Sequence, residues 1–363
     1  DDAAAALATA LQLIDTAERP AGKTDAANLR LRVEQELAFL ALENDRFEEG
    51  WSHYRGRWFA HAEHPEDTLQ PRLWQGEPLA GRRLVIAREQ GIGDEIQFAS
   101  LYGELVRTAA SVVVQCSQRL EPAFRRSFPG ATFWPCEETP DAWQALRERL
   151  APDDLVTFAG GLPRWQRRTR ADFAPAKAFL RPDPAAVAQW RERLAALGDG
   201  RRIGISWRGG TGPNFSAQRS IALADLVPAI PSGAVLVDLQ YTDCSIEIAH
   251  VRQLAGVSIA QFADMRDDLE ATINLVAALD LVITVQTAVG HLAGALGVKT
   301  WVLVPRAPST IRWLAANGRT PWYSSVSLLE QVEPGDWQPV LARLSMKLKA
   351  AQRGQRSRNN EAS

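Results

Sequence analysis

Cysteine is scarce in this chain. Among 363 residues there are three cysteines, Cys116, Cys136 and Cys244, and no two of them form a Cys-x-x-Cys pair. An odd and scattered set fits neither a disulfide framework nor a zinc site. The sequence therefore predicts a protein of a reducing compartment.

Long apolar runs and a strong net charge are also missing. No stretch approaches the roughly 20 apolar residues that a bilayer-spanning helix needs, and no signal peptide stands at the start. The formal net charge is −2, so no global field would attract nucleic acid or an acidic membrane. We expect a cytoplasmic protein with no membrane span and no nucleic-acid partner. Because the chain begins with Asp1 inside a helical pattern, we expect it to be a fragment of a longer product.

Two motifs that would assign a chemistry directly are incomplete or absent. The turn Gly91-Ile92-Gly93-Asp94 follows an apolar strand, but Ile96 stands where a dinucleotide fingerprint has its third glycine. No acidic pair of the Asp-x-Asp kind stands in a suitable loop. The sequence therefore predicts neither a metal site nor a bound cofactor.

What is present is enough apolar sequence, 46% of the residues, to build two or three domain cores. Residues 1 to about 18 form an amphipathic helical pattern, Asp25 is the expected N-cap of a second helix ending at Glu43, and residues 47–61 predict a third. The second and third helices, joined by an Asn/Asp turn, resemble a tetratricopeptide repeat. A solenoid needs about three repeats, so either more repeats precede this segment or it leans on the next domain. A peptide-binding groove and a plain helical hairpin both remain open for it.

From residue 82 short apolar strands alternate with helices, which is the pattern of parallel α/β domains. A basic, proline-containing segment at 164–184 separates two such series. We predict strands at 83–87, 111–115, 131–134, 154–158, 202–207, 234–239, 257–259, 281–285 and 299–304, and helices at 94–109, 141–150, 184–197, from 223, 246–254, 268–279, 288–296 and 336–351. The expected parts are a helical region (1–72), two Rossmann-like domains (73–178 and 179–335), and a C-terminal helix with a disordered tail (336–363).

Residues 280–305 form the strand–helix–strand unit around which the chain is best understood. A β-branched run at 281–285 suits a strand buried on both faces, and a small-residue helix at 288–296 is stopped by Gly297. The connecting loop runs from the carboxyl end of a strand into a helix amino terminus, where open α/β sheets bind ligands.

The start of that helix predicts an anion site. The amides of Thr287, Ala288 and Val289 have no partner within the helix, and with the helix dipole they favour a diphosphate. His291, one turn further, could add a donor. The alternative for His291 is a partly buried histidine whose hydrogen bonds are made within the protein.

Other polar residues follow predicted strands in the same way. Asp94 is either a cap of the following helix, which position alone favours, or a carboxylate that accepts a proton from an attacking hydroxyl. In the second domain Trp207 opens a glycine-bearing loop that Arg219 closes, and Arg219 is either a phosphate clamp or a solvated charge. The next strand is followed by Gln240, Tyr241, Thr242 and Asp243, where ribose or base contacts could form. Asp264 is either a ligand contact or a helix cap.

Three segments in this order carry a family resemblance: REQGIGDEIQFAS, then RIGISWRGG with QRSIALADL, then QFADMRDDLEATINLVAALDLVITVQTAVGHLAGALGVKTWVLVP. With them the chain resembles bacterial tetratricopeptide-linked glycosyltransferases, which are related to glycosyltransferase family 9, the ADP-heptose:lipopolysaccharide heptosyltransferases. A looser similarity extends to the protein O-GlcNAc transferases. The resemblance covers roughly residues 30–340. It implies a GT-B fold, in which two Rossmann-like domains face a cleft, with the acceptor largely on the first and the nucleotide-sugar on the second.

The resemblance also implies roles for particular residues. Asp94 matches the proposed base of the Gly-x-Gly-Asp turn, and Gly93 and Gln97 would lie on the acceptor side. Arg219 matches the basic residue that binds the donor phosphate. Trp207, Gln240 and Asp264 would belong to the donor side.

The turn that holds the diphosphate and sugar in that family reads Asp-Thr-x-x-x-His. Here it is Gln286, Thr287, Ala288, Val289, Gly290 and His291. Gln286 departs from the pattern. A neutral amide can donate to a sugar hydroxyl, but it lacks the charge and one strong acceptor. The departure leaves the identity of the sugar, and activity itself, open.

The sequence therefore predicts a metal-independent glycosyltransferase that uses a nucleotide-sugar as co-substrate. Because helices precede the two α/β domains, a protein acceptor docked by them is preferred, with flagellin one candidate that no residue here selects. The alternatives are a heptosyltransferase-like enzyme of lipopolysaccharide or glycan assembly, and a non-catalytic scaffold with a degenerate transferase domain. Gln286 keeps the scaffold alternative alive.

Overall fold

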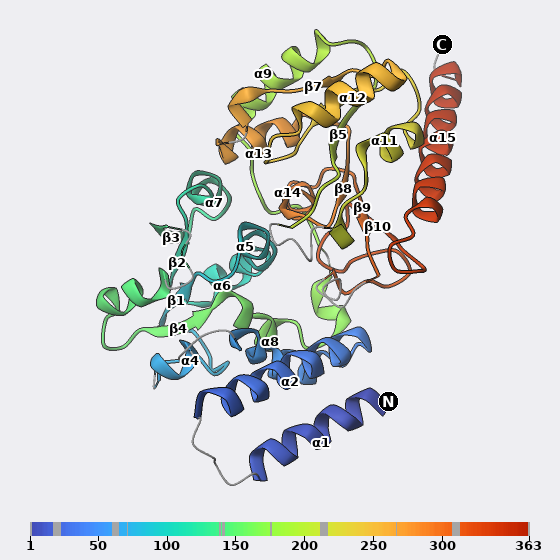
Figure 1. Cartoon of the computed structure of the whole chain (residues 1–363). Coiled ribbons are helices and arrows are strands. Elements are labelled where there is room, and N and C mark those ends of the chain that lie inside the picture. The colour runs from blue at the N-terminus through green and yellow to red at the C-terminus, as the bar shows by residue number, and fades with distance from the viewer. Residues whose placement is uncertain are drawn as a thin grey trace. The chain divides into compact units, whose positions relative to one another are not determined.

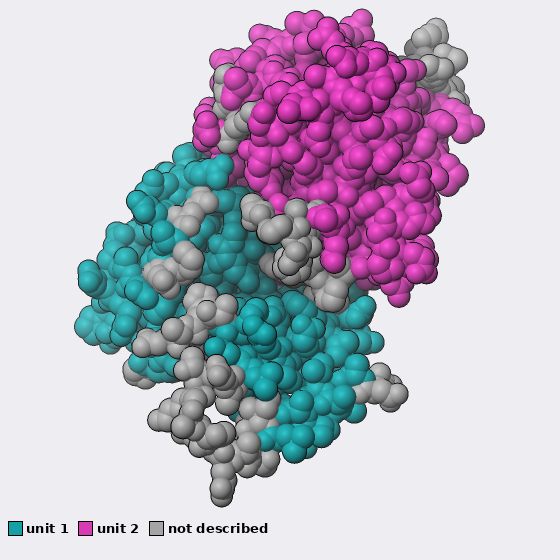
Figure 2. Space-filling view, in the orientation of Figure 1, with its two compact units in different colours: residues 1–176, 311–314 teal, residues 177–310, 315–363 magenta. Residues whose placement is uncertain are grey.

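In the computed structural model the chain divides into two compact units, each with one parallel sheet (Figures 1 and 2). The first unit consists of residues 1–176 and 311–314, and the second of residues 177–310 and 315–363. The structure describes residues 2–16, 23–59, 65–70, 72–137, 139, 142–174, 176–210, 217–265, 267–306 and 313–361. Among these residues, no helix is both long and apolar enough to cross a bilayer.

The first unit begins with helices. They are α1 (Asp2–Thr16), α2 (Lys23–Glu43), α3 (Phe47–His53), the 3-10 helix η1 (Tyr54–Trp58) and α4 (Pro65–Thr68). The helix α2 begins before Asp25, so the expected N-cap lies within its first turn. The predicted third helix is α-helical only as far as His53. Its 3-10 continuation packs tightly on α2, because an added Cβ at Gly56 would lie 2.3 Å from the backbone nitrogen of Gln35. That these helices form a tetratricopeptide repeat stays a prediction.

The sheet of the first unit has the strand order β3-β2-β1-β4, and all its pairings are parallel. Its elements are β1 (Arg83–Ala87), α5 (Ile92–Ala99), α6 (Tyr102–Thr108), β2 (Ser111–Ser117), α7 (Glu121–Ser127), β3 (Ala131–Cys136), η2 (Ala142–Arg149), β4 (Leu155–Phe158), η3 (Ala159–Gly161), α8 (Pro163–Gln166) and η4 (Arg170–Phe173). A single helix was predicted from 94 to 109, but the chain breaks between α5 and α6. The hydroxyl of Ser100 donates to the carbonyl of Gln97 at 2.7 Å, which competes with helical bonding at that point.

The sheet of the second unit has the order β10-β9-β8-β5-β6-β7, again parallel throughout. Its elements are α9 (Pro184–Ala195), β5 (Arg202–Ser206), α11 (Leu223–Leu226), η5 (Val227–Ala229), β6 (Val235–Asp238), α12 (Ser245–Ala255), β7 (Ile259–Ala260), η6 (Ala263–Met265), α13 (Leu269–Ala277), β8 (Leu281–Val285), α14 (Ala288–Ala295), β9 (Thr300–Val304), β10 (Val326–Glu330) and α15 (Gln338–Glu361). Counted from β5, this is the doubly wound order 3-2-1-4-5-6 of dinucleotide-binding folds, read from the opposite edge. The helix α15 extends to Glu361, through most of the tail that was predicted to be disordered.

Strand order reverses once in each sheet. In the second unit the chain leaves β5 towards β6 and later returns to place β8 on the other side of β5. In the first unit β1 pairs with β2 on one side and with β4 on the other. Loops at such a switch point leave in opposite directions, and the crevice between them is where open α/β sheets bind ligands. Each unit therefore offers one place where a site is expected.

Candidate functional site

A pocket of about 420 Å³ lies beyond the carboxyl ends of β5 and β6 in the second unit. It is lined by Arg208, Gly210, Ala217, Ser220, Gln240, Tyr241 and Thr242. The strand β5 also borders the switch point with β8, so this pocket stands where the fold predicts a ligand. The lining is polar, and it contains a guanidinium, an amide, two aliphatic hydroxyls and a tyrosine ring that is 42% exposed.

The side-chain amide of Gln240 is fixed in one orientation. Its Oε1 accepts from the Ser206 hydroxyl at 2.9 Å, from the Trp207 N–H at 2.7 Å and from the Arg208 N–H at 3.0 Å. If the amide were flipped, its NH₂ group would face these donors instead of the oxygen, and the hydrogen bonds would be lost. The side chain is 5% exposed, and its Nε2 has no hydrogen-bond partner among the described residues. A buried donor of this kind is costly unless a ligand or water accepts from it.

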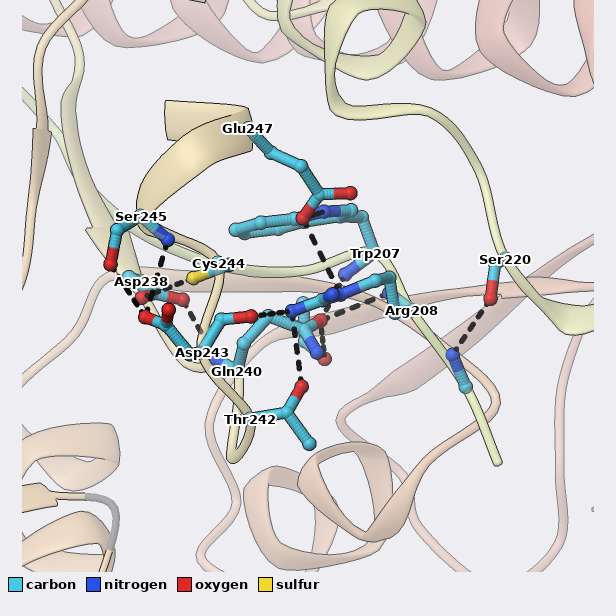
Figure 3. A network of polar contacts seen from close by, with 12 residues as sticks. Trp207, Arg208, Ser220, Asp238, Gln240, Thr242, Asp243, Cys244, Ser245 and Glu247 are labelled. Atoms are coloured by element: carbon cyan, nitrogen blue, oxygen red, sulfur yellow. Dashed lines mark hydrogen bonds and ion pairs between the residues drawn. The ribbon is translucent and has the colours of Figure 1, made fainter. Parts of the chain in front are cut away.

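Arg208 reaches from the loop after β5 to the loop after β6 (Figure 3). Its Nη2 donates to the Thr242 hydroxyl at 3.0 Å and to the carbonyl of Asp243 at 2.6 Å, and its Nε lies 3.4 Å from a carboxylate oxygen of Glu247. The guanidinium is thus held at the pocket by partners that are partly exposed. It keeps donors to spare, because a guanidinium carries five N–H groups.

Trp207 contributes to this site through its backbone. Its indole ring is fully buried in the core of the second unit, and Nε1 donates to Glu247 at 3.2 Å. The ring therefore helps to fix Glu247, which in turn pairs with Arg208. The donor-side role of Trp207 stays a prediction.

Gly209 brings together the two loops at the switch point. An added Cβ would lie 3.1 Å from Cβ of Arg219 and 3.3 Å from the carbonyl oxygen of Gln286. The Gly209 N–H donates to the Ser220 hydroxyl at 3.1 Å. Arg219 and Gln286, which are distant in sequence, therefore both lie against the same glycine. A larger residue at 209 would separate them.

The helix α14 begins as predicted, with Thr287 as its N-cap. The Thr287 hydroxyl accepts from the Val289 N–H at 3.2 Å and lies 3.1 Å from the Thr284 hydroxyl. One of the three amides expected to meet an anion is therefore already capped, which leaves those of Thr287 and Ala288 for that role. The helix has a buried core of small residues that places it directly behind β8.

His291 lies one turn into α14 and is held by Tyr323. Its Nδ1 lies 3.1 Å from the Tyr323 hydroxyl, and the two rings meet edge to face with centroids 5.8 Å apart. The ring is held by the protein and is still partly exposed, so the two interpretations of this histidine are compatible.

Asp264 and Asp238 are two acidic residues of the second unit. Asp264 lies in η6, and its side chain is outside the described residues. Asp238 ends β6, where dinucleotide-binding folds carry an acid for the ribose. Its Oδ1 accepts from the Gln240 N–H at 2.8 Å, and Oδ2 accepts from the Cys244 thiol at 3.0 Å and from Gln261 at 3.2 Å. Asp238 therefore supports the loop that carries Gln240.

In the first unit Asp94 lies in the first turn of α5, three residues after the N-cap Gly91. Its carboxylate accepts from the Gly91 N–H at 3.4 Å, and the side chain is partly exposed. Asp94 thus makes a capping contact, and part of its surface is accessible to solvent. Gly93 is partly exposed beside it, whereas Gln97 is 1% exposed and belongs to the interior.

The sequence predicts ribose or base contacts for residues 240–243, which include the pocket residues Tyr241 and Thr242. It assigns no role to two other residues that line the pocket, Arg208 and Ser220. Each lies within a few residues of one that was predicted, so the available signal was the position after a parallel strand. An arginine or hydroxyl in a loop is normally a solvated side chain, and only the folded contacts distinguish these from others. Among the described residues, no group of three or more His, Cys, Asp and Glu is placed to hold a metal ion.

No family model matches the chain. Protein FlbA of Caulobacter vibrioides is 32% identical to it over 330 residues, which are 86% of this chain and 54% of FlbA. The chain thus spans about half the length of this curated relative.

Three solved structures resemble the chain at low identity. A family 9 glycosyl transferase from Veillonella parvula has 12% identity and a TM-score of 0.45, and covers 76% of this chain and 92% of its own. ADP-heptose lipopolysaccharide heptosyltransferase II of E. coli has 16% identity and a TM-score of 0.47, and the match covers 74% of this chain and 99% of the other. E. coli heptosyltransferase WaaC, solved with ADP-2-deoxy-2-fluoro heptose, has 11% identity and a TM-score of 0.46, and the match covers 74% of this chain and 99% of the other. The description of this chain's fold follows from the strand orders of its two sheets.

Proposed function

We propose that this chain is a glycosyltransferase of GT-B type that moves a sugar from a nucleotide-sugar to a hydroxyl acceptor. The observation that carries the proposal is the polar pocket after β5 and β6. At its wall lies the buried Nε2 of Gln240, which has no partner within the described part of the chain. Support also comes from the sequence similarity of the Gly-x-Gly-Asp turn and of residues 286–291 to family 9 transferases.

In this proposal the pocket takes the nucleotide. The exposed ring of Tyr241 offers a face for the base, since aromatic side chains stack on planar rings. The donors of Arg208 and Gln240 meet ribose or phosphate oxygens. Arg219 and the start of α14 at Thr287 take the diphosphate, because a helix amino terminus favours negative charge.

The proposed reaction is a displacement at the anomeric carbon of the sugar. Asp94 accepts the proton of the acceptor hydroxyl as its oxygen forms a bond to that carbon. The bond from the anomeric carbon to the phosphate oxygen breaks, and its electron pair leaves with the nucleoside diphosphate. The charge that develops there is stabilised by Arg219 and the amides at Thr287 and Ala288, which is electrostatic stabilisation at the site of change. These cationic and amide groups fill the place of a metal ion in the proposal.

The acceptor is proposed to be a protein that the helices before the first sheet dock, with flagellin one candidate. A heptosyltransferase-like enzyme that acts on a lipopolysaccharide or other glycan is the alternative within the same chemistry. A scaffold with a degenerate transferase domain is the alternative outside it. The pocket favours an enzyme or at least a nucleotide binder, because its lining brings a guanidinium, an amide and a tyrosine ring together at the ends of two parallel strands.

A screen of nucleoside diphosphates by thermal unfolding tests the pocket. A nucleotide present at 100 times its dissociation constant should add about 2.7 kcal/mol of apparent stability. Gln240→Ala should weaken this binding at least tenfold, since it removes the donor at the pocket wall. Gln189→Ala, at an exposed position of α9, is the matched control and should bind as the parent does. If no nucleotide stabilises the parent, the proposed function is wrong.

Asp94→Asn tests the base. The asparagine oxygen can still accept from the Gly91 N–H, so the helix start is retained while proton acceptance is lost. We expect sugar transfer to fall by about 10²- to 10⁴-fold, with nucleotide affinity unchanged. Asp153→Asn, at an exposed position of the same unit, should transfer at the parent rate. Transfer by Asp94→Asn within twofold of the parent would remove Asp94 from the mechanism.

A further inference from the structure

Glu89 is a buried charge in the loop that joins β1 to α5. Its side chain has no exposed surface, and it stands two residues after the end of β1 and five before Asp94. Burial raises the pKa of Glu89, and Arg57 opposes that effect. A carboxylate in such a place is retained only if other groups compensate its charge.

The compensating charge comes from the helical region. Nε of Arg57, in η1, donates to Glu89 at 2.7 Å, and the Arg57 side chain is 3% exposed. The same guanidinium donates to Glu66 at 3.2 Å and to the carbonyl of Tyr54 at 3.1 Å, and it lies over the ring of Trp58 at 4.7 Å. Arg57 is therefore fixed on several sides before it meets Glu89.

A second partner of Glu89 comes from the strand on the other side of the switch point. The Gly160 N–H, just after β4, donates to the carboxylate of Glu89. An added Cβ at Gly160 would lie 2.3 Å from Oε1 of Glu89. Glu89 thus joins the helical region, the β1–α5 loop and the β4 end at one buried point.

The neighbouring residues fix the rest of the loop. Nε of Arg88 donates to Glu95 at 2.6 Å, both side chains being buried, and Glu95 also accepts from the Ser117 N–H at 2.9 Å. Between these two buried pairs Gln90 takes a left-handed conformation, with φ of 57°. A non-glycine residue there is uncommon and persists where its surroundings determine it. The chain then enters α5 through Gly91, and Asp94 lies in the first turn of that helix.

We infer that Arg57 is a positioning residue: through Glu89 it fixes the β1–α5 loop and thereby the direction of the Asp94 carboxylate. The helical region is then part of the reaction machinery of the first unit, in addition to any acceptor that it docks. This inference rests on the proposed function, because it takes Asp94 as the base. It goes beyond that function in assigning the helical region a role in the reaction step.

Arg57→Lys is the first test. Lysine keeps the positive charge but lacks the planar fork that meets Glu89, Glu66 and the Tyr54 carbonyl together. We expect kcat of sugar transfer to fall at least tenfold, with KM for the donor unchanged because the donor pocket belongs to the second unit. Arg55→Lys is the matched control on the same 3-10 helix, since Arg55 is 43% exposed, and it should transfer as the parent does.

The double variant Arg57→Met with Glu89→Gln separates positioning from stability. Replacing both buried charges by neutral groups leaves neither one unpaired, so the first unit should unfold at a temperature close to that of the parent. Transfer should nevertheless stay at least tenfold reduced, because the loop has lost its fixed contact. Transfer at the parent rate in this double variant, or in Arg57→Lys, would overturn the positioning role while leaving the proposed function intact. A parent that binds no nucleotide would instead remove the proposed function itself.

Discussion

Asp45 and Arg170 form an ion pair in the first unit, between the turn before α3 and η4. The hydrogen bond with Arg170 is the main cause that lowers the pKa of Asp45. A carboxyl whose pKa is lowered on folding contributes stability above its unfolded value, about 3.9, and loses that contribution as pH falls through the lower folded value. The Asp45 side chain is 51% exposed, so the contribution is small, under about 1 kcal/mol.

We therefore expect Asp45→Asn to be slightly less stable than the parent at pH 7 and equally stable once the pH lies well below the folded pKa of Asp45. Asparagine suits the position, because residue 45 has φ of 58°, a left-handed conformation in which Asn and Asp are enriched. Urea unfolding at several pH values measures the difference. In an Arg170→Met background the same substitution should have no effect at either pH, and a difference that persists there would assign it to another cause.

Single residues of the site were predictable only where the strand positions were. Gln240 and Thr287 lie just after the ends of predicted strands, and Asp94 lies in the first turn of the helix that follows one. Arg208 was not predicted, because nothing in a sequence distinguishes a loop arginine held by Thr242 from one in solvent. The burial of the Trp207 indole was likewise out of reach, since the same position after a strand admits inward and outward side chains.

At the scale of elements, the cap of α14 can be tested apart from its ligand. Thr287→Ala removes the side-chain acceptor of the Val289 N–H and should cost about 1 kcal/mol of stability. Thr287→Ser keeps a hydroxyl at the same place and should lose less than half of that. Urea unfolding without nucleotide measures both variants. Equal stability of the alanine variant and the parent would show that this cap does not stabilise the helix.

Elements with a strong pattern were predicted well. The bounds of β1 and β8 agree with the predicted strands at 83–87 and 281–285, because each is a β-branched run buried along its length. The strand β10 was missed, since its sequence Val-Ser-Leu-Leu-Glu is short, lies at the sheet edge and mixes both faces. The 3-10 segments were missed for a different reason. They share the composition of α-helices, and tertiary packing decides between the two.

At the scale of the whole molecule, truncation should distinguish two parts of the helical region. Deleting residues 1–22 removes α1, which packs on α2 and leaves side chains such as Leu13 64% exposed. We expect the shortened protein to fold and to bind nucleotide. Deleting residues 1–64 removes Arg57 together with Trp58, which is buried in the core around β1, and should cost at least about 3–5 kcal/mol. Circular dichroism and thermal unfolding measure both.

The longer truncation is therefore an unsuitable test of acceptor docking, because loss of modification would follow from unfolding alone. A folded chain of residues 65–363 with the parent unfolding temperature would contradict the buried pair as a source of stability. The overall architecture, two parallel sheets after a helical start, follows from the alternation of strands and helices. The sequence could not predict that a residue of the third helix reaches the first sheet, since that contact joins positions 32 residues apart.

The buried contact between Arg57 and Glu89 has a consequence for how such chains can be recombined. A helical region taken from another protein would place a neutral or mismatched side chain against Glu89. The buried carboxylate would then lack its counter-charge, and the first unit would be destabilised. Grafts should succeed only when both partners are transferred or both are neutralised. The helical region and the β1–α5 loop therefore have to be exchanged together. Replacing the helical region alone is a poor way to redirect this protein to a new target.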